Sequence, residues 1–203
     1  MKLHQSLQAP NPRRVRIFLF EKGLSVPMVN VDLGKLEQRT PEFHAINAFE
    51  TIPVLELDDG TMIGESIAIC RFFEEAQPLP ALFGADARQR VDVEMWQRRV
   101  EFQLFLPIAQ AFRHSHPAMA AMESPQVPDW CASCKAKALL AMERFDGALE
   151  GRPFIAGDAF SVADITGLVA LDWARYARIT IPGEFKNLNR WHADLKGRPS
   201  AKA

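Results

Sequence analysis

The spacing of apolar residues along the chain changes character near residue 80. Before that point, short alternating apolar runs predict strands, and apolar positions three or four residues apart predict helices. The predicted strands cover residues 2–5, 27–31, 53–57 and 61–64, and the predicted helices open at Asn11, Thr40 and Ser66, with Asn11 and Ser66 as expected N-caps. The order strand, helix, strand, helix, two strands, helix forms one complete small α/β layer.

Beyond residue 80 the strand signals disappear, and long amphipathic segments predict helices only. These cover residues 87–114, 129–149, 161–174 and 185–195. The third is apolar nearly all round, as expected of a central buried helix, and Ser161 with Asp164 fits a capping box at its start. We therefore predict an α/β domain at 1–78, a linker at 79–86 and an all-helical domain at 87–203.

The first helical segment of the second domain, residues 87–114, carries two apolar stripes. One runs through Val91, Met95, Phe102, Phe105 and Ala109, and the other through Val93, Trp96 and Val100. Such a pattern predicts a helix that is covered on two sides. Pro107 lies inside it, and because the apolar period continues beyond the proline, we expect a kink rather than a helix end.

Composition limits the classes of function. The chain has 203 residues, 48% of them apolar, which suits one large or two small cores. Its formal net charge is −1 with acids and bases interspersed, so a nucleic-acid partner is not expected. The N-terminal residues form no signal peptide or membrane span, so we expect a cytoplasmic protein without a membrane partner. Its three cysteines are then expected to be reduced thiols.

Two segments of the first domain carry candidate binding chemistry. In one, Pro53 follows Ile52 at the start of a predicted strand; a cis bond there would turn the Ile52 backbone toward an extended ligand, whereas a trans proline would merely mark an edge strand. In the other, Glu65 and Ser66 precede a helix. Helix-start amides attract a carboxylate and Glu65 can accept an ammonium group, so the pair suits the α-amino acid end of a peptide. Alternatively, Ser66 only caps the helix and Glu65 faces solvent.

A resemblance to the cytosolic glutathione transferases joins these segments and covers nearly the whole chain. It is carried by FETIPVLELDDGTMIGESIAI, which resembles the cis-proline strand, hairpin and Glu-Ser glutathione site of that family. It extends over LHQSLQAPNPRRVRIFLFEKGL, KLEQRTPEFHAIN and the helical-domain capping motif FIAGDAFSVADI. The resemblance implies a thioredoxin-like N-terminal domain that holds glutathione, followed by an all-α C-terminal domain.

The resemblance also implies roles for individual residues. Ile52 would make main-chain hydrogen bonds to the cysteinyl unit of glutathione, and Pro53 would shape that strand. Glu65 and Ser66 match the residues that hold the γ-glutamyl group.

The glycyl end of glutathione matches the family less closely. Gln38 and Thr51 lie where polar side chains usually meet the glycyl carboxylate. The family often has a lysine at Thr51 and a histidine at Glu50, so this sequence departs from the pattern at both positions.

The main departure from the family is at the catalytic turn. The family usually activates the thiol with a Tyr, Ser or Cys near the start of the first helix, but the matching residue here is Ala9, whose side chain has no hydrogen-bond donor. Asn11 can donate one, and the turn resembles the Nu-class, yeast-prion-like branch, in which an asparagine helps to hold the thiol. A donor and the positive end of the helix would together favour thiolate. Asn11 could instead only cap the helix, and Ser6 could be a substitute donor.

The implied function is that of an enzyme, a glutathione transferase or glutathione-dependent disulfide reductase. Glutathione is the expected cosubstrate, no metal is expected, and the second substrate is a small apolar electrophile bound between the domains or a small disulfide. A homodimer is expected, with the 87–114 region and the helix that opens at Ser66 as candidate contacts. The competing hypothesis, favoured by Ala9, is a catalytically silent glutathione-binding or interaction module.

Other features carry weaker chemistry. Cys131 and Cys134 have redox-motif spacing, but they fall in the helical domain and are interpreted as incidental. His114 and His116 form an incomplete metal set because no acid or cysteine is near. Aromatic residues of the helical domain belong to its core by default, with Phe105 and Phe112 as candidates to line an apolar pocket.

Overall fold

The computed structural model describes residues 1–203 and divides into two compact units. The first contains Met1–Ala81 with Lys202–Ala203, and the second contains Leu82–Ala201. The domain bounds expected from the sequence, 1–78 and 87–203 with a linker at 79–86, stay a prediction.

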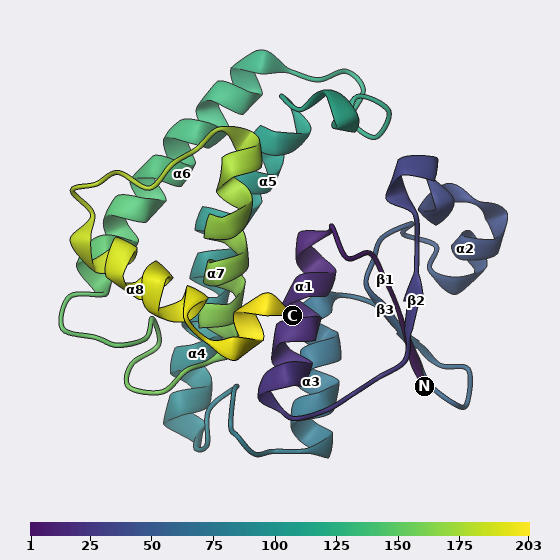
Figure 1. The fold of residues 1–203 in the computed structure, drawn as a ribbon, viewed down its shortest axis with the longest axis horizontal. Coiled ribbons are helices and arrows are strands. Elements are labelled where there is room, and N and C mark those ends of the chain that lie inside the picture. Colours follow the sequence, from purple (N-terminus) through teal and green to yellow (C-terminus); the bar gives the residue numbers. More distant parts are fainter. The chain divides into compact units, whose positions relative to one another are not determined.

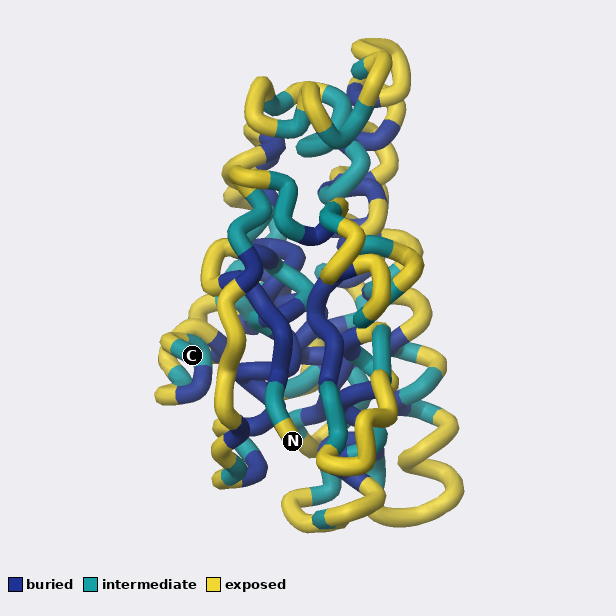
Figure 2. Tube along the Cα trace, turned by 90° about the vertical axis from the view of Figure 1, so that its right-hand side faces the viewer, coloured by how far each residue is buried: buried dark blue, intermediate teal, exposed yellow.

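The first unit is built on a four-stranded sheet in the order β2-β1-β3-β4. The strands are β1 Lys2–Gln5, β2 Met28–Asn30, β3 Val54–Glu56 and β4 Met62–Ile63; β1 pairs parallel with β2 and antiparallel with β3, which pairs antiparallel with β4. Helices α1 Pro10–Glu21 and α3 Ser66–Ala76 lie side by side on one face, and the short α2 Pro41–Ile46 lies on the other (Figure 1). The central strands are mostly buried and the edge strand β2 is exposed (Figure 2).

Two of the N-caps expected from the sequence, Asn11 and Ser66, are not N-caps in the structure. Thr40 caps α2 by accepting a hydrogen bond from the N–H of Phe43, 3.3 Å. Asn11 does not cap α1, because the helix begins at Pro10, whose fixed φ suits a first turn, and Ala9 is the N-cap. Ser66 does not cap α3 either: it is the first helical residue.

The second unit is helical throughout. It contains α4 Ala87–Arg99, a π-helical turn Val100–Phe105, α5 Leu106–Arg113, α6 Pro128–Ala148, α7 Val162–Ala174 and α8 Lys186–Lys196 (Figure 1). α4, the π-helical turn and α5 follow one another without a break, as the periodicity predicts. The distortion expected from Pro107 takes the form of the π-helical turn. A proline lacks the N–H and crowds the carbonyl of the preceding turn, and the wider turn relieves that conflict.

The outer side of this long helical segment differs from the prediction. Val100 and Phe105 are buried, but Val91 is 64% and Phe102 56% exposed. The expectation of a helix covered on two sides is therefore wrong for the single chain, because α6 and α7 pack against it and leave one apolar stripe open.

The prediction that the segment 161–174 forms a central buried helix is confirmed. Every residue of α7 from Val162 to Leu171 is buried. The capping box at its start is present: the Asp164 carboxylate accepts hydrogen bonds from the N–H and the hydroxyl of Ser161, each 2.9 Å.

Candidate active site

Six of the seven residues proposed from the sequence line one pocket of about 70 Å³ in the first unit. They are Asn11, Thr51, Ile52, Pro53, Glu65 and Ser66. The pocket therefore joins the first turn of α1, the segment before β3 and the start of α3. Gln38 does not line it; it is buried in the single-turn 3₁₀ helix Glu37–Arg39.

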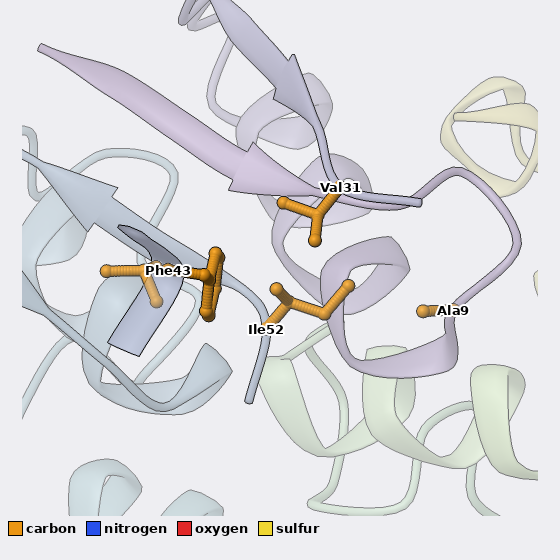
Figure 3. Packing of buried hydrophobic residues seen from close by; sticks show 5 residues of the cluster. Ala9, Val31, Phe43 and Ile52 are labelled. Carbon is orange, nitrogen blue, oxygen red and sulfur yellow. The ribbon is translucent and has the colours of Figure 1, made fainter. Parts of the chain in front are cut away.

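The segment before β3 presents a free stretch of main chain. The Ile52–Pro53 bond is cis. The Ile52 side chain is buried with Ala9, Val31 and Phe43, which anchors the segment (Figure 3). Neither the N–H nor the carbonyl of Ile52 is hydrogen-bonded within the chain, so both can pair with an extended ligand.

The start of α3 leaves its first amide groups open. Glu65, the N-cap, adopts φ 62° and ψ 117° and makes no capping hydrogen bond with its side chain. A left-handed φ is unfavourable for a residue with a Cβ, and such residues concentrate at functional sites. Ser66 follows with its side chain buried at the pocket, so open N–H groups and the positive end of the helix dipole meet there.

Thr51 is held by a residue that sequence reasoning missed. The Nδ2 of Asn47 donates to the Thr51 carbonyl, 2.8 Å, and to its hydroxyl, 3.1 Å. The Oδ1 of Asn47 accepts from the N–H of Phe49, 3.1 Å, which is the side-chain turn typical of asparagine and a signal the sequence offered. Because the Thr51 hydroxyl already accepts a hydrogen bond, its own hydrogen can be directed to a ligand.

The first turn of α1 has few donors. Pro10 and Pro12 lack N–H groups, and the Ala9 side chain is buried in the cluster with Ile52 rather than offered to the pocket. Asn11 has both its main-chain N–H and its side-chain Nδ2 without partners in the chain. Its Oδ1 accepts a hydrogen bond from Nη2 of Arg14, 2.5 Å. The alternative that Asn11 only caps the helix is wrong.

Family comparisons agree with this arrangement. The family model described as glutathione S-transferase, N-terminal domain, matches residues 9–76, and the one for the glutathione S-transferase C-terminal domain matches residues 116–199. The chain is 38% identical to glutathione S-transferase 2 of Saccharomyces cerevisiae over 205 residues, covering 100% of this chain and 88% of the relative. The chain belongs to the glutathione S-transferase family. This confirms the predicted family and enzyme class, a glutathione-dependent transferase.

Solved structures confirm the transferase fold. A crystal structure of Gtt2 from Saccharomyces cerevisiae matches with a TM-score of 0.95 at 38% identity, covering 100% of this chain and 99% of that one. A glutathione S-transferase domain-containing protein from Marinobacter aquaeolei VT8 matches with a TM-score of 0.94 at 38% identity, covering 98% and 99%. The narrower likeness of the catalytic turn to the Nu class stays a prediction.

Cys131, Cys134 and His114 belong to the second unit. Cys131 and Cys134 are free and buried in α6, and burial raises the pKa of the Cys134 thiol, which disfavours a reactive thiolate. The His114 ring accepts from the N–H of Val127, 3.1 Å, and faces Glu123, 3.7 Å. No cluster of His, Cys, Asp and Glu side chains has an arrangement suited to a metal ion, and no helix has the length and apolar character needed to cross a membrane.

Ser6 and Glu50, two further positions weighed from the sequence, also lie outside the pocket lining. Ser6 is buried directly after β1, and its carbonyl accepts from the N–H of Ala9, 3.2 Å. The Glu50 carboxylate lies 3.4 Å from the His44 ring.

Proposed function

We propose that this transferase holds glutathione in the pocket of the first unit and uses its thiolate for conjugation to small electrophiles or for reduction of small disulfides. The observation that carries the proposal is the convergence of Asn11, the segment 51–53 and the pair Glu65–Ser66 on one pocket. Three chemically different surfaces then match three parts of one tripeptide.

The γ-glutamyl end is assigned to the start of α3. Its carboxylate would accept from the Ser66 hydroxyl and from open amides of the first turn, where the helix dipole favours a negative charge. Its ammonium group would face the Glu65 carboxylate, which is exposed at the pocket. A charge-assisted pair at each group gives this end its affinity and its orientation.

The cysteinyl unit is assigned to Ile52 and the glycyl carboxylate to Thr51 and Gln38. The unpaired N–H and carbonyl of Ile52 support the first assignment, since an extended peptide pairs with main-chain groups of this kind. The Thr51 hydroxyl, oriented by Asn47, supports the second. Gln38 does not line the pocket, so its part in binding would need the glycyl end to extend beyond the pocket.

Asn11 is assigned as the hydrogen-bond donor to the thiol of glutathione. The amide Nδ2 would donate to the sulfur, and the positive end of α1 adds to the same field, so both lower the thiol pKa from its ordinary value near 8.5. This donor would replace the usual hydroxyl, whose position Ala9 has filled with a buried methyl group.

The second substrate is proposed to pack on aromatic side chains of the second unit. Phe112 is the best candidate, because its ring meets those of Trp173 at 5.4 Å and Tyr176 at 6.3 Å and the cluster is partly exposed. Phe105 is buried and less accessible to a substrate. An apolar electrophile or an aromatic disulfide suits such a surface.

We also propose a homodimer in the cytoplasm. The exposed apolar stripe on the outer side of α4, the π-helical turn and α5 supports this. Val91, Met95, Phe102 and Leu106 are each at least 37% exposed and recur at helical spacing. A second copy would cover this stripe.

Wild-type protein tests the proposal in two assays with glutathione. One follows conjugation of a chlorinated nitroarene and the other reduction of hydroxyethyl disulfide, with glutathione binding measured by calorimetry. Turnover in either assay supports the enzyme. Binding without turnover in both would favour the catalytically silent module, and absence of binding would overturn the site itself.

A further inference from the structure

We infer that Arg14 is a positioning residue. It holds Oδ1 of the Asn11 side-chain amide, so that the N–H groups of this amide point toward the thiol of bound glutathione. The inference rests on the proposed function, because it concerns the same donor. It adds a residue that does not line the pocket and that the sequence did not single out.

The hydrogen bond between the two residues determines which way the amide points. Arg14 is one helical turn after Asn11, and its Nη2 lies 2.5 Å from Oδ1 of Asn11. A guanidinium has only donors, so the flipped amide would bring two N–H groups face to face. Arg14 therefore selects one of the two amide orientations and leaves Nδ2 as the group that Asn11 offers to the pocket.

Burial makes this selection firm. Arg14 is only 4% exposed, so its guanidinium cannot swing into solvent as a surface arginine does. Asn11 itself lines the pocket, and its Nδ2 has no partner in the chain. A permanent cation on the carbonyl side of an amide also polarises it and strengthens its N–H as a donor.

The inferred role predicts that the pKa of the bound glutathione thiol depends on Arg14, which would not be so for an arginine with a purely structural role. Arg14→Gln removes the positive charge and the planar guanidinium. The pKa of the bound glutathione thiol should then rise by about one unit, which is a tenfold loss of thiolate at pH values below that pKa. Arg14→Lys keeps the positive charge but not the planar guanidinium, so the rise of the thiol pKa should be smaller. In an Asn11→Ala background, neither substitution should change the thiol pKa further.

The test measures thiolate absorbance of the glutathione complex against pH for the single and double variants. Arg13→Gln is the matched control, because it removes a positive charge from the same turn of α1 without a bond to Asn11. Each variant is first checked for a cooperative thermal transition, and Arg14→Lys carries the test if Arg14→Gln does not fold. An equal rise of the thiol pKa in the Asn11→Ala background, or no rise in any folded Arg14 variant, overturns the inference. Wild-type protein that binds glutathione without forming thiolate would instead contradict the proposed function.

Discussion

The indole N–H of Trp191 in α8 donates to Oδ1 of Asp164 at the start of α7, 2.9 Å. The same carboxylate accepts from the N–H of Ile155, 2.9 Å, and from Ser161. One fully buried acid thus joins two helices and the loop before them. Burial raises the pKa of Asp164, while the hydrogen bonds act in the opposite direction.

We predict that Asp164→Ala is among the most destabilising single substitutions in the chain. It leaves three buried N–H donors without an acceptor, at about 1–3 kcal/mol each, so a loss of about 3 kcal/mol or more in the free energy of unfolding is expected. Urea unfolding followed by circular dichroism measures it. Asp194→Ala on the exposed side of α8 is the control and should change little. A loss as small as that of the control would show that the carboxylate does not hold these elements together.

Gly167 in α7 and Gly147 in α6 should respond in opposite ways to alanine. A Cβ at Gly167 would clash with Cη2 of Trp191, whereas a Cβ at Gly147 would meet nothing within 4 Å. Alanine favours helix over glycine by about 1 kcal/mol, so Gly147→Ala should stabilise, while overpacking by about 1–3 kcal/mol should make Gly167→Ala destabilising. Thermal unfolding of both variants checks this, and a stabilised Gly167→Ala would contradict the close packing of α7 on Trp191.

Asn11→Ala should reduce turnover mainly at low pH. Without the amide donor the pKa of bound glutathione thiol rises, so the thiolate fraction falls at every pH below the new pKa and recovers above it. We expect kcat/KM to fall about tenfold near pH 6.5, the equivalent of one pKa unit, and the two pH profiles to converge above about pH 9. Asn30→Ala, on the exposed edge strand β2, is the matched control. Profiles that stay parallel at all pH values would argue against Asn11 as the thiol donor.

Glu65→Gln and Ser66→Ala should weaken glutathione binding rather than chemistry. Each removes a charge-assisted contact worth about 1.5–3 kcal/mol, so KM for glutathione should rise at least tenfold with a smaller change in kcat. Glu75→Gln, near the other end of α3 with 76% of its side chain exposed, should leave KM unchanged. Steady-state kinetics with varied glutathione distinguishes these outcomes, and an unchanged KM in both site variants would remove the γ-glutamyl assignment.

Phe102→Ser should shift the protein from dimer toward monomer. Phe102 is 56% exposed in the middle of the apolar stripe, and its loss removes a large apolar surface from the proposed contact between copies. Leu140→Ser on α6, where the leucine is 47% exposed, is the control for a comparable apolar residue outside the stripe. Sedimentation velocity over a range of concentrations measures the association. A wild-type monomer at all concentrations would overturn the dimer proposal.

Most of the residues that line the pocket could be predicted because they lie in local motifs. Pro53 and the pair Glu65–Ser66 each stand at the start of an element, where periodicity and helix-start chemistry mark them. The sequence missed Arg14 and Asn47, which act through other residues: the first orients the Asn11 amide and the second holds Thr51. The role of Arg14 could not be recognised from the sequence, because an arginine at the polar start of a helix is expected to face solvent. Only the packing of the folded chain shows that it is buried.

The sequence by itself determined the order of the elements, the all-round burial of α7 and the capping box of Ser161 and Asp164, since these depend on periodicity and on neighbours three or four residues apart. The tertiary structure decided where α1 and α3 begin, which stripe of the long helical segment stays open, and that segments forty residues apart line one pocket. Local spacing is set by backbone geometry, whereas burial and convergence depend on which distant side chains compete for the same space.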